Sequence, residues 1–155
     1  MAGEALLIGI ATISVVVAGF AAIAPGIARD ASQWTAGHRI RLRAIVSTSF
    51  NVTFESLLPA VLYPAIGDER TTLVVASGLV FVYLLFIVGL RLRQMIRAGN
   101  PRNARTVALM SAGFVATALF GLNAVVFGSL TVYALALCIQ LSVAALSFYS
   151  LLADE

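Results

Sequence analysis

An all-α bundle of membrane-spanning helices is the fold class that the sequence predicts, and three observations support it. The 155-residue chain is 61% hydrophobic and only 11% charged, and its mean hydropathy is +1.00. Soluble domains are about 45–50% apolar and about 25% charged. The apolar residues form long stretches, and the arginines lie between these stretches. We therefore expect a single transmembrane domain over residues 1–155.

Five spans are predicted from the lengths of the apolar stretches. A helix needs about 20 mostly apolar residues to cross some 30 Å of hydrocarbon. The last stretch, Thr106–Leu152, has 47 residues without a charge, which is about twice one span. Polar and small residues interrupt it at Asn123, Gly128, Ser129 and Thr131 and predict a hairpin there. The expected spans are 5–24, 44–66, 73–90, 106–125 and 130–152, or four spans if the last region is not a hairpin.

The connection between the second and third spans is short. Gly67 is typical of a position just after a helix, and Asp68 is a typical residue for capping the start of the next one. We therefore expect the second helix to end at Gly67 and Asp68 to cap the third. No connection in the chain approaches the size of a domain, so function is expected within the membrane or at its surface.

The arginines predict the orientation of the bundle. Cytoplasmic loops of membrane proteins carry an excess of Lys and Arg. Nine of the ten arginines lie in or beside the first and third connections, and only Arg70 lies on the other side. Five spans then place the N-terminus outside. We expect a basic cytoplasmic surface that contacts anionic lipid head groups, at about 1 kcal/mol per residue. Its members are Arg39, Arg41, Arg43, Arg91, Arg93 and Arg97.

The composition also excludes several kinds of chemistry. All ten basic residues are arginine, so a Schiff-base lysine and a P-loop lysine are both absent. One histidine, His38, and one cysteine, Cys138, cannot form a haem or zinc site alone. We therefore expect no enzyme activity, no cofactor and no metal. The sequence pI of about 9.6 comes from arginines that flank apolar spans, so nucleic acid is not an expected partner. The Arg-, Ala-, Val- and Gly-rich composition is typical of a GC-rich prokaryotic genome.

Glu55 is the strongest functional candidate because it is a carboxylate in the middle of the second span. A charged side chain at the bilayer centre costs roughly 2.5–3.5 kcal/mol on insertion scales. Ser47, Asn51 and Glu55 follow at intervals of four, which predicts one polar helical face. Thr48 lies beside that face. At 1.5 Å per residue, Glu55 lies about 18 Å from Arg43, near the expected midplane.

Pro59 lies four residues after Glu55 and predicts a helix kink. Since proline has no amide N–H, it cannot bond the backbone carbonyl of Glu55. The Glu55 carbonyl, which lacks its helical donor, and the Glu55 carboxyl therefore lie at the same depth in the span. Such carbonyls are tolerated at membrane depth where other groups or water satisfy them. Asn123 and Gln140 are the candidate polar partners on the later spans.

Two interpretations of this polar face follow. In the first, Glu55, Asn51, Ser47 and Thr48 line a path for a cation or proton, and several copies of the chain form a ring of carboxylates. In the second, a protonated Glu55 bonds to a neighbouring helix and fixes its packing. The first favours a homo-oligomeric ion channel or small transporter in the inner cell membrane. The alternative function is a non-catalytic scaffold or accessory subunit of a larger membrane complex, in which helix faces rich in small residues bind partner helices.

Overall fold

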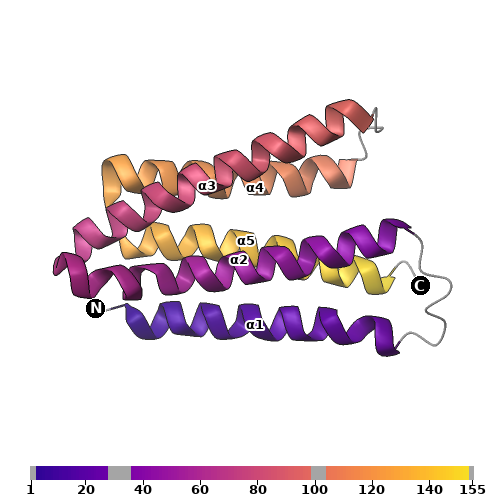
Figure 1. Cartoon of the computed structure of the whole chain (residues 1–155), viewed down its shortest axis with the longest axis horizontal. Coiled ribbons are helices and arrows are strands. Elements are labelled where there is room, and N and C mark those ends of the chain that lie inside the picture. The colour runs from indigo at the N-terminus through magenta and orange to yellow at the C-terminus, as the bar shows by residue number, and fades with distance from the viewer. Residues whose placement is uncertain (1–2, 28–35, 99–103, 154–155) are drawn as a thin grey trace.

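The chain folds into five long helices joined in up-and-down order (Figure 1). The computed structural model describes residues 3–27, 36–98 and 104–153, and the side chains of residues 3–23, 42–90, 93 and 110–149. The predicted all-α class is confirmed. The helices are α1 (Glu4–Ile27), α2 (Ala36–Ile66), α3 (Glu69–Ala98), α4 (Ala104–Leu122, continued by a π-helical segment, Asn123–Phe127) and α5 (Leu130–Ala153).

Each helix contains a stretch that is long and apolar enough to cross a membrane. The predicted division of the last apolar region into two helices is confirmed. Among the described residues, the apolar stretches are Glu4–Ile23, Leu42–Ile66, Glu69–Leu90, Met110–Phe127 and Leu130–Tyr149.

Two of the helices extend well beyond the predicted spans. α2 begins at Ala36 rather than at residue 44, and α3 continues to Ala98 rather than ending at residue 90. Both extensions carry arginines, which are good helix formers. Hydropathy marks where a helix becomes polar, and this change alone does not end the helix.

The turn between α2 and α3 matches its sequence prediction. Gly67 has a φ of +76°, and α2 ends at the residue before it. The Asp68 carboxylate accepts the Thr71 amide N–H at 2.7 Å and the Thr71 hydroxyl at 2.6 Å. Asp68 therefore caps α3, and these two bonds hold the pKa of its carboxyl below the usual value.

The turn between α4 and α5 is more crowded than the turn at Gly67. The Gly128 amide N–H donates to the Asn123 carbonyl at 2.8 Å, which closes the π-helical segment, and Gly128 has a φ of +56°. A Cβ at Gly128 would lie 2.9 Å from Arg70 Cγ and 3.0 Å from Val74 Cγ2. Both the backbone conformation and the close approach of α3 therefore favour glycine here.

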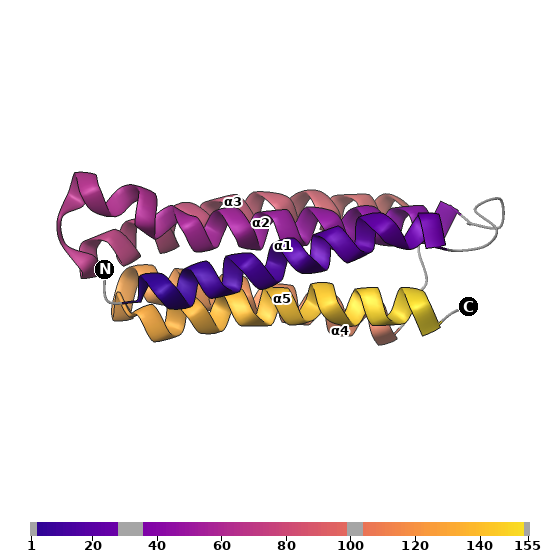
Figure 2. The ribbon, with the colours of Figure 1, turned by 90° about the horizontal axis from the view of Figure 1, so that it is seen from below.

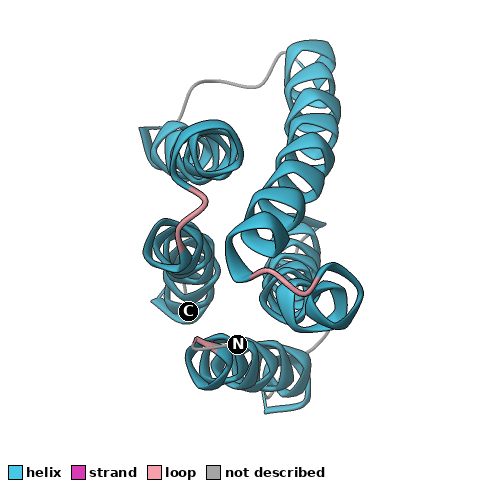
Figure 3. Cartoon of the chain, turned by 90° about the vertical axis from the view of Figure 1, so that its left-hand side faces the viewer, coloured by secondary structure: helices cyan, strands magenta, loops and turns pink. Residues whose placement is uncertain are grey.

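Four helices form a closed ring, and the fifth lies outside it. α2, α3, α4 and α5 each contact the next, and α5 also contacts α2. α1 packs mainly against α2 and also contacts α5, and it crosses from α5 at its N-terminal end to α2 at its C-terminal end (Figures 2 and 3). The turns at Gly67 and Gly128 lie at one end of the bundle. The arginine-rich ends of α2 and α3 lie at the other end (Figure 1).

The core consists of two apolar clusters of different size. The larger one joins all five helices toward the turn end and includes Leu73, Phe120 and Leu137, all of them buried. The smaller one joins α1 and α2 around Ala21 and Ile45 near the other end, with Phe148 of α5 packed against it. Glu55 is buried, with only 4% of the residue exposed.

Candidate functional site

Glu55 lies on α2 and faces α5 of the same chain. Its Oε2 atom accepts a hydrogen bond from Gln140 Nε2 at 2.6 Å. Gln140 is itself buried on α5. The structure therefore brings Glu55 together with one of its two candidate partners, a residue 85 positions later in the sequence.

The second carboxyl oxygen of Glu55 is buried and has no hydrogen-bond partner. Within the described part of the chain, only two buried side-chain polar atoms are in this state, Glu55 Oε1 and Ser49 Oγ. Most buried polar atoms in proteins are hydrogen-bonded, so each exception requires an explanation. A carboxyl oxygen with no partner is a place where a proton, a water molecule or a cation can bind.

Pro59 leaves the Glu55 main-chain carbonyl without its helical donor, and Tyr133 supplies a replacement. The Tyr133 hydroxyl donates to this carbonyl at 2.6 Å. Tyr133 is fully buried on α5, and its ring packs edge-on against Phe120 of α4, with ring centroids 5.1 Å apart. Residue Glu55 is thus held at two points by α5, at its side chain by Gln140 and at its backbone by Tyr133.

Sequence reasoning did not identify Tyr133, although two signals point to it. The carbonyl released by Pro59 requires a donor from another helix. On α5, Tyr133 precedes Gln140 by seven residues, which is two turns, so both project from the same face. A tyrosine at that spacing from the partner amide is well placed to reach the released carbonyl.

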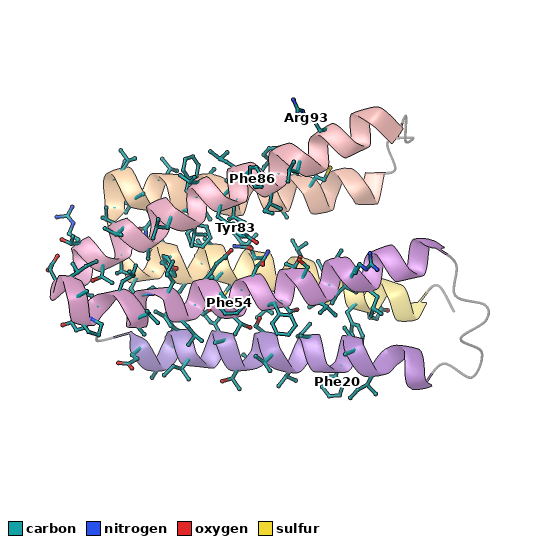
Figure 4. The ribbon with its side chains drawn as sticks, in the orientation of Figure 1. Phe20, Phe54, Tyr83, Phe86 and Arg93 are labelled. Atoms are coloured by element: carbon teal, nitrogen blue, oxygen red, sulfur yellow. The ribbon has the colours of Figure 1, made fainter. Side chains whose placement is uncertain are left out.

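The other predicted path residues do not share the environment of Glu55. Ser47 is exposed, and Thr48 is half-buried. Asn51 is half-buried and accepts a bond from the Tyr83 hydroxyl of α3 at 3.1 Å. Tyr83, labelled in Figure 4, comes from the helix on the other side of α2 from α1. The predicted polar face is therefore divided between a buried contact with α5, a contact with α3 and an exposed position.

Asn123, the other candidate partner, belongs to the α4–α5 turn. Its Nδ2 donates to Ser77 Oγ at 2.8 Å, and its Oδ1 accepts the Ser129 amide N–H at 2.8 Å. Both side-chain bonds hold α3 and the start of α5 against the π-helical segment. Asn123 is fully buried and fixes the hairpin, while Gln140 is the residue that bonds Glu55.

A second polar cluster lies on the face of α2 toward α1. Ser14 Oγ donates to the Ser49 carbonyl. The Thr53 hydroxyl lies 3.1 Å from Ser14 Oγ and 3.0 Å from the same carbonyl. Ser14 and Ser49 are both fully buried. These three hydroxyl residues form a neutral contact between the two helices.

The structure gives the side chains of two residues of the predicted basic surface. The side chains of Arg43 and Arg93 are exposed, and Figure 4 shows Arg93 directed away from the bundle. The side chains of Arg39, Arg41, Arg91 and Arg97 lie outside the described residues. All six positions are in the ends of α2 and α3 that share one end of the bundle.

Over the residues for which the structure gives side chains, no group of three or more His, Cys, Asp or Glu side chains is placed to hold a metal ion. Cys138 is exposed on α5. The candidate site is therefore a single carboxyl with an amide and a phenol, and it can bind or release one proton without further ligands.

Comparisons with protein-family models, with curated proteins and with solved structures give no match to this chain.

Proposed function

We propose that this protein is a multi-pass protein of the prokaryotic inner membrane that acts as a cation or proton channel or as a small transporter. The observation that carries the proposal is the buried Glu55 carboxyl with one unpartnered oxygen. Ionisable residues inside membrane spans mark ion pathways and proton relays.

The depth of Glu55 supports this proposal. α2 has an apolar stretch from Leu42 to Ile66. At 1.5 Å per residue, Glu55 lies about 18 Å from Arg43 and about 16 Å from Ile66. The carboxyl is therefore close to the middle of the stretch, where substrate and ion sites of transporters are found.

We propose an orientation with the arginine-rich end of the bundle in the cytoplasm and the N-terminus outside. Positively charged loops favour the cytoplasmic side. The exposed Arg43 and Arg93 side chains would then contact anionic lipid head groups. The outward faces of the helices carry large apolar side chains suited to lipid, such as Phe20, Phe54 and Phe86, which are labelled in Figure 4.

We propose that the path for the cation or proton runs along the α2–α5 contact within each subunit. In a homo-oligomer, every subunit would then have its own path. The outward face of α2 is apolar, with Phe50, Phe54 and Val61 exposed. Glu55 instead faces α5, so a symmetric ring of copies would not place its carboxyl on a central axis. The exposed apolar faces remain available for contacts between copies or with lipid.

Ion flux from liposomes tests the proposal. Purified protein is reconstituted, and proton and cation fluxes are followed under defined gradients for wild type, Glu55→Gln and Glu4→Gln. Glu4 is an exposed carboxyl in the first turn of α1, so it controls for the loss of a carboxyl elsewhere. We expect flux in wild type and Glu4→Gln, and a loss of at least tenfold in Glu55→Gln. An absence of flux under every gradient would overturn the proposal.

A second candidate function is that of a non-catalytic scaffold or accessory subunit. The exposed apolar side chains on the outward face of α2, Phe50, Phe54 and Val61, favour it, because they are available for contact with partner helices. Under this alternative, Phe54→Ala would weaken assembly with partner helices, whereas Glu55→Gln, which lies inside the chain, would leave assembly unchanged and there would be no flux to lose. Copurification of wild type, Phe54→Ala and Glu55→Gln with their native membrane partners, beside the flux assay, separates the two functions.

A further inference from the structure

We infer that the species bound at Glu55 is a proton and not a metal cation. This inference rests on the proposed function and names the species that the site accepts. It follows from which atoms around the carboxyl are donors and which are acceptors. Oxygen ligands are needed for a metal cation, whereas a single free oxygen is enough for a proton.

The oxygens of Glu55 are mostly occupied by donors. Oε2 accepts the Gln140 amide N–H, and the main-chain carbonyl accepts the Tyr133 hydroxyl. The nearby Ser56 hydroxyl already donates to the Val52 carbonyl at 2.7 Å. Only Oε1 is free. Alkali and alkaline-earth cations are held by several oxygens at once, typically six to eight for calcium. A metal ion here would find only Oε1 unoccupied and would have to share its other two oxygens with the donors from α5.

Gln140 suits both protonation states of a carboxyl. A glutamine amide carries two N–H donors and one carbonyl acceptor on the same group. Its Nε2 donates to the carboxylate in the arrangement described above. After a half-turn of the amide, its carbonyl oxygen can accept a bond from the protonated acid. The site can therefore gain and lose a proton without a movement of either helix.

The surroundings of Glu55 contain no competing charge in the described part of the bundle. From α5, the titratable group that contacts Glu55 is Tyr133, which is committed to the main-chain carbonyl. From α3, the Tyr83 hydroxyl bonds Asn51. On α1, Glu4 lies in the first turn, ten residues before Ser14, which contacts α2 at Ser49. Glu4 is therefore at the end of the bundle and away from the level of Glu55. No described arginine is paired with the carboxyl, so a proton is the cation that neutralises it.

Infrared difference spectroscopy of the reconstituted protein tests this inference without a gradient. A step in pH is applied in buffers containing sodium, potassium or only a large organic cation. We expect a C=O stretch band of a protonated carboxyl that is the same in all three salts. The band is absent from Glu55→Gln and present in Glu4→Gln. In Gln140→Leu the band should remain and shift in frequency, because the carboxyl persists and its hydrogen bond is lost.

Two results would overturn the inference. The first is a band that disappears when sodium or potassium is added at constant pH, since the metal ion would then replace the proton. The second is the absence of a carboxyl band at every pH both in wild type and in Glu55→Asp, a variant that keeps a carboxyl at this position. Proton binding without flux would overturn the proposed function and leave this inference intact. Cation flux together with a sodium-sensitive band would overturn this inference and leave the proposed function intact.

Discussion

α2 carries two polar clusters on different faces, and they are satisfied in different ways. Toward α1, Ser14 and Thr53 both reach the Ser49 carbonyl, and all three residues are neutral. Toward α5, a carboxyl depends on the side chains of Gln140 and Tyr133 from a distant helix. Each face also has one buried atom without a partner, Ser49 Oγ on the first and Glu55 Oε1 on the second.

The difference lies in what each unpartnered atom can do locally. A serine hydroxyl in a helix can rotate and donate to the carbonyl four residues earlier, which for Ser49 is that of Ile45. A carboxylate has only acceptor oxygens and cannot bond the carbonyls of its own helix. Packing therefore explains the cluster toward α1. The cluster toward α5 retains an acid oxygen that packing leaves unused.

The largest expected effect comes from removing Gln140. Gln140→Leu leaves both carboxyl oxygens of Glu55 buried without a donor and should lower the free energy of unfolding by about 1–3 kcal/mol. The double variant Glu55→Leu/Gln140→Leu should recover most of that loss, because no polar atom is then left unpaired. The measurement is unfolding in mixed micelles with increasing denaturing detergent.

Ser142→Ala is the matched control for this series. Ser142 is an exposed residue on α5 whose hydroxyl bonds only the Cys138 carbonyl of its own helix. Its loss should change the free energy of unfolding by less than about 0.5 kcal/mol. A Gln140→Leu protein as stable as Ser142→Ala would show that the face toward α5 demands no partner, and the contrast between the two clusters would fail.

The next effect tests the main-chain contact. Tyr133→Phe removes the donor to the Glu55 carbonyl and should cost about 1–2 kcal/mol of unfolding free energy. In a Pro59→Ala background the same substitution should cost close to nothing, because an alanine at this position supplies a helical N–H to that carbonyl. Equal costs in the two backgrounds would show that the contribution of the Tyr133 hydroxyl does not depend on the carbonyl released by Pro59.

The cluster toward α1 should respond more weakly. Ser14→Ala removes one hydroxyl, while Thr53 retains its bond to the Ser49 carbonyl. We expect a loss of about 0.5 kcal/mol in the same unfolding assay, close to the average for side-chain bonds between membrane helices. Thr12→Val is the control, since the exposed Thr12 bonds only the Ile8 carbonyl of its own helix. A loss above that of Gln140→Leu would reverse the ranking of the two faces.

The sequence predicts the helices well because their signals are local. Apolar stretches of sufficient length indicate each membrane-crossing segment, and the polar residues from Asn123 to Thr131 mark the hairpin. Gly67 and Asp68 give the turn between α2 and α3 by their own conformational and capping preferences. Pro59 similarly indicates that the Glu55 carbonyl needs an outside donor.

The environment of the site is not local, and the sequence leaves it open. Residues four apart on a helix advance by about 40° beyond a full turn, so Ser47 and Glu55 differ by about 80° in direction. This drift takes Ser47 to an exposed position while Glu55 is buried against α5. α5 is apolar over most of its surface, so hydropathy does not indicate which of its faces meets α2. The choice between Asn123 and Gln140 therefore depends on tertiary packing.

A carboxyl outside the apolar stretches gives the smallest effect and a reference for Glu55. Thr71 lowers the pKa of Asp68 in the folded protein, so the cap stabilises the fold above the unfolded pKa of about 4. That contribution is lost as pH falls through the lower, folded pKa. Asp68→Asn keeps a capping side chain and removes its titration, so its melting temperature should fall less than that of wild type below about pH 4. Identical acid profiles for the two proteins would assign the acid response to other groups. A flatter profile in Asp68→Asn would give the contribution of the Asp68 carboxyl to the acid response. The contribution of Glu55 is then the difference in melting temperature against pH between Asp68→Asn and Asp68→Asn/Glu55→Gln.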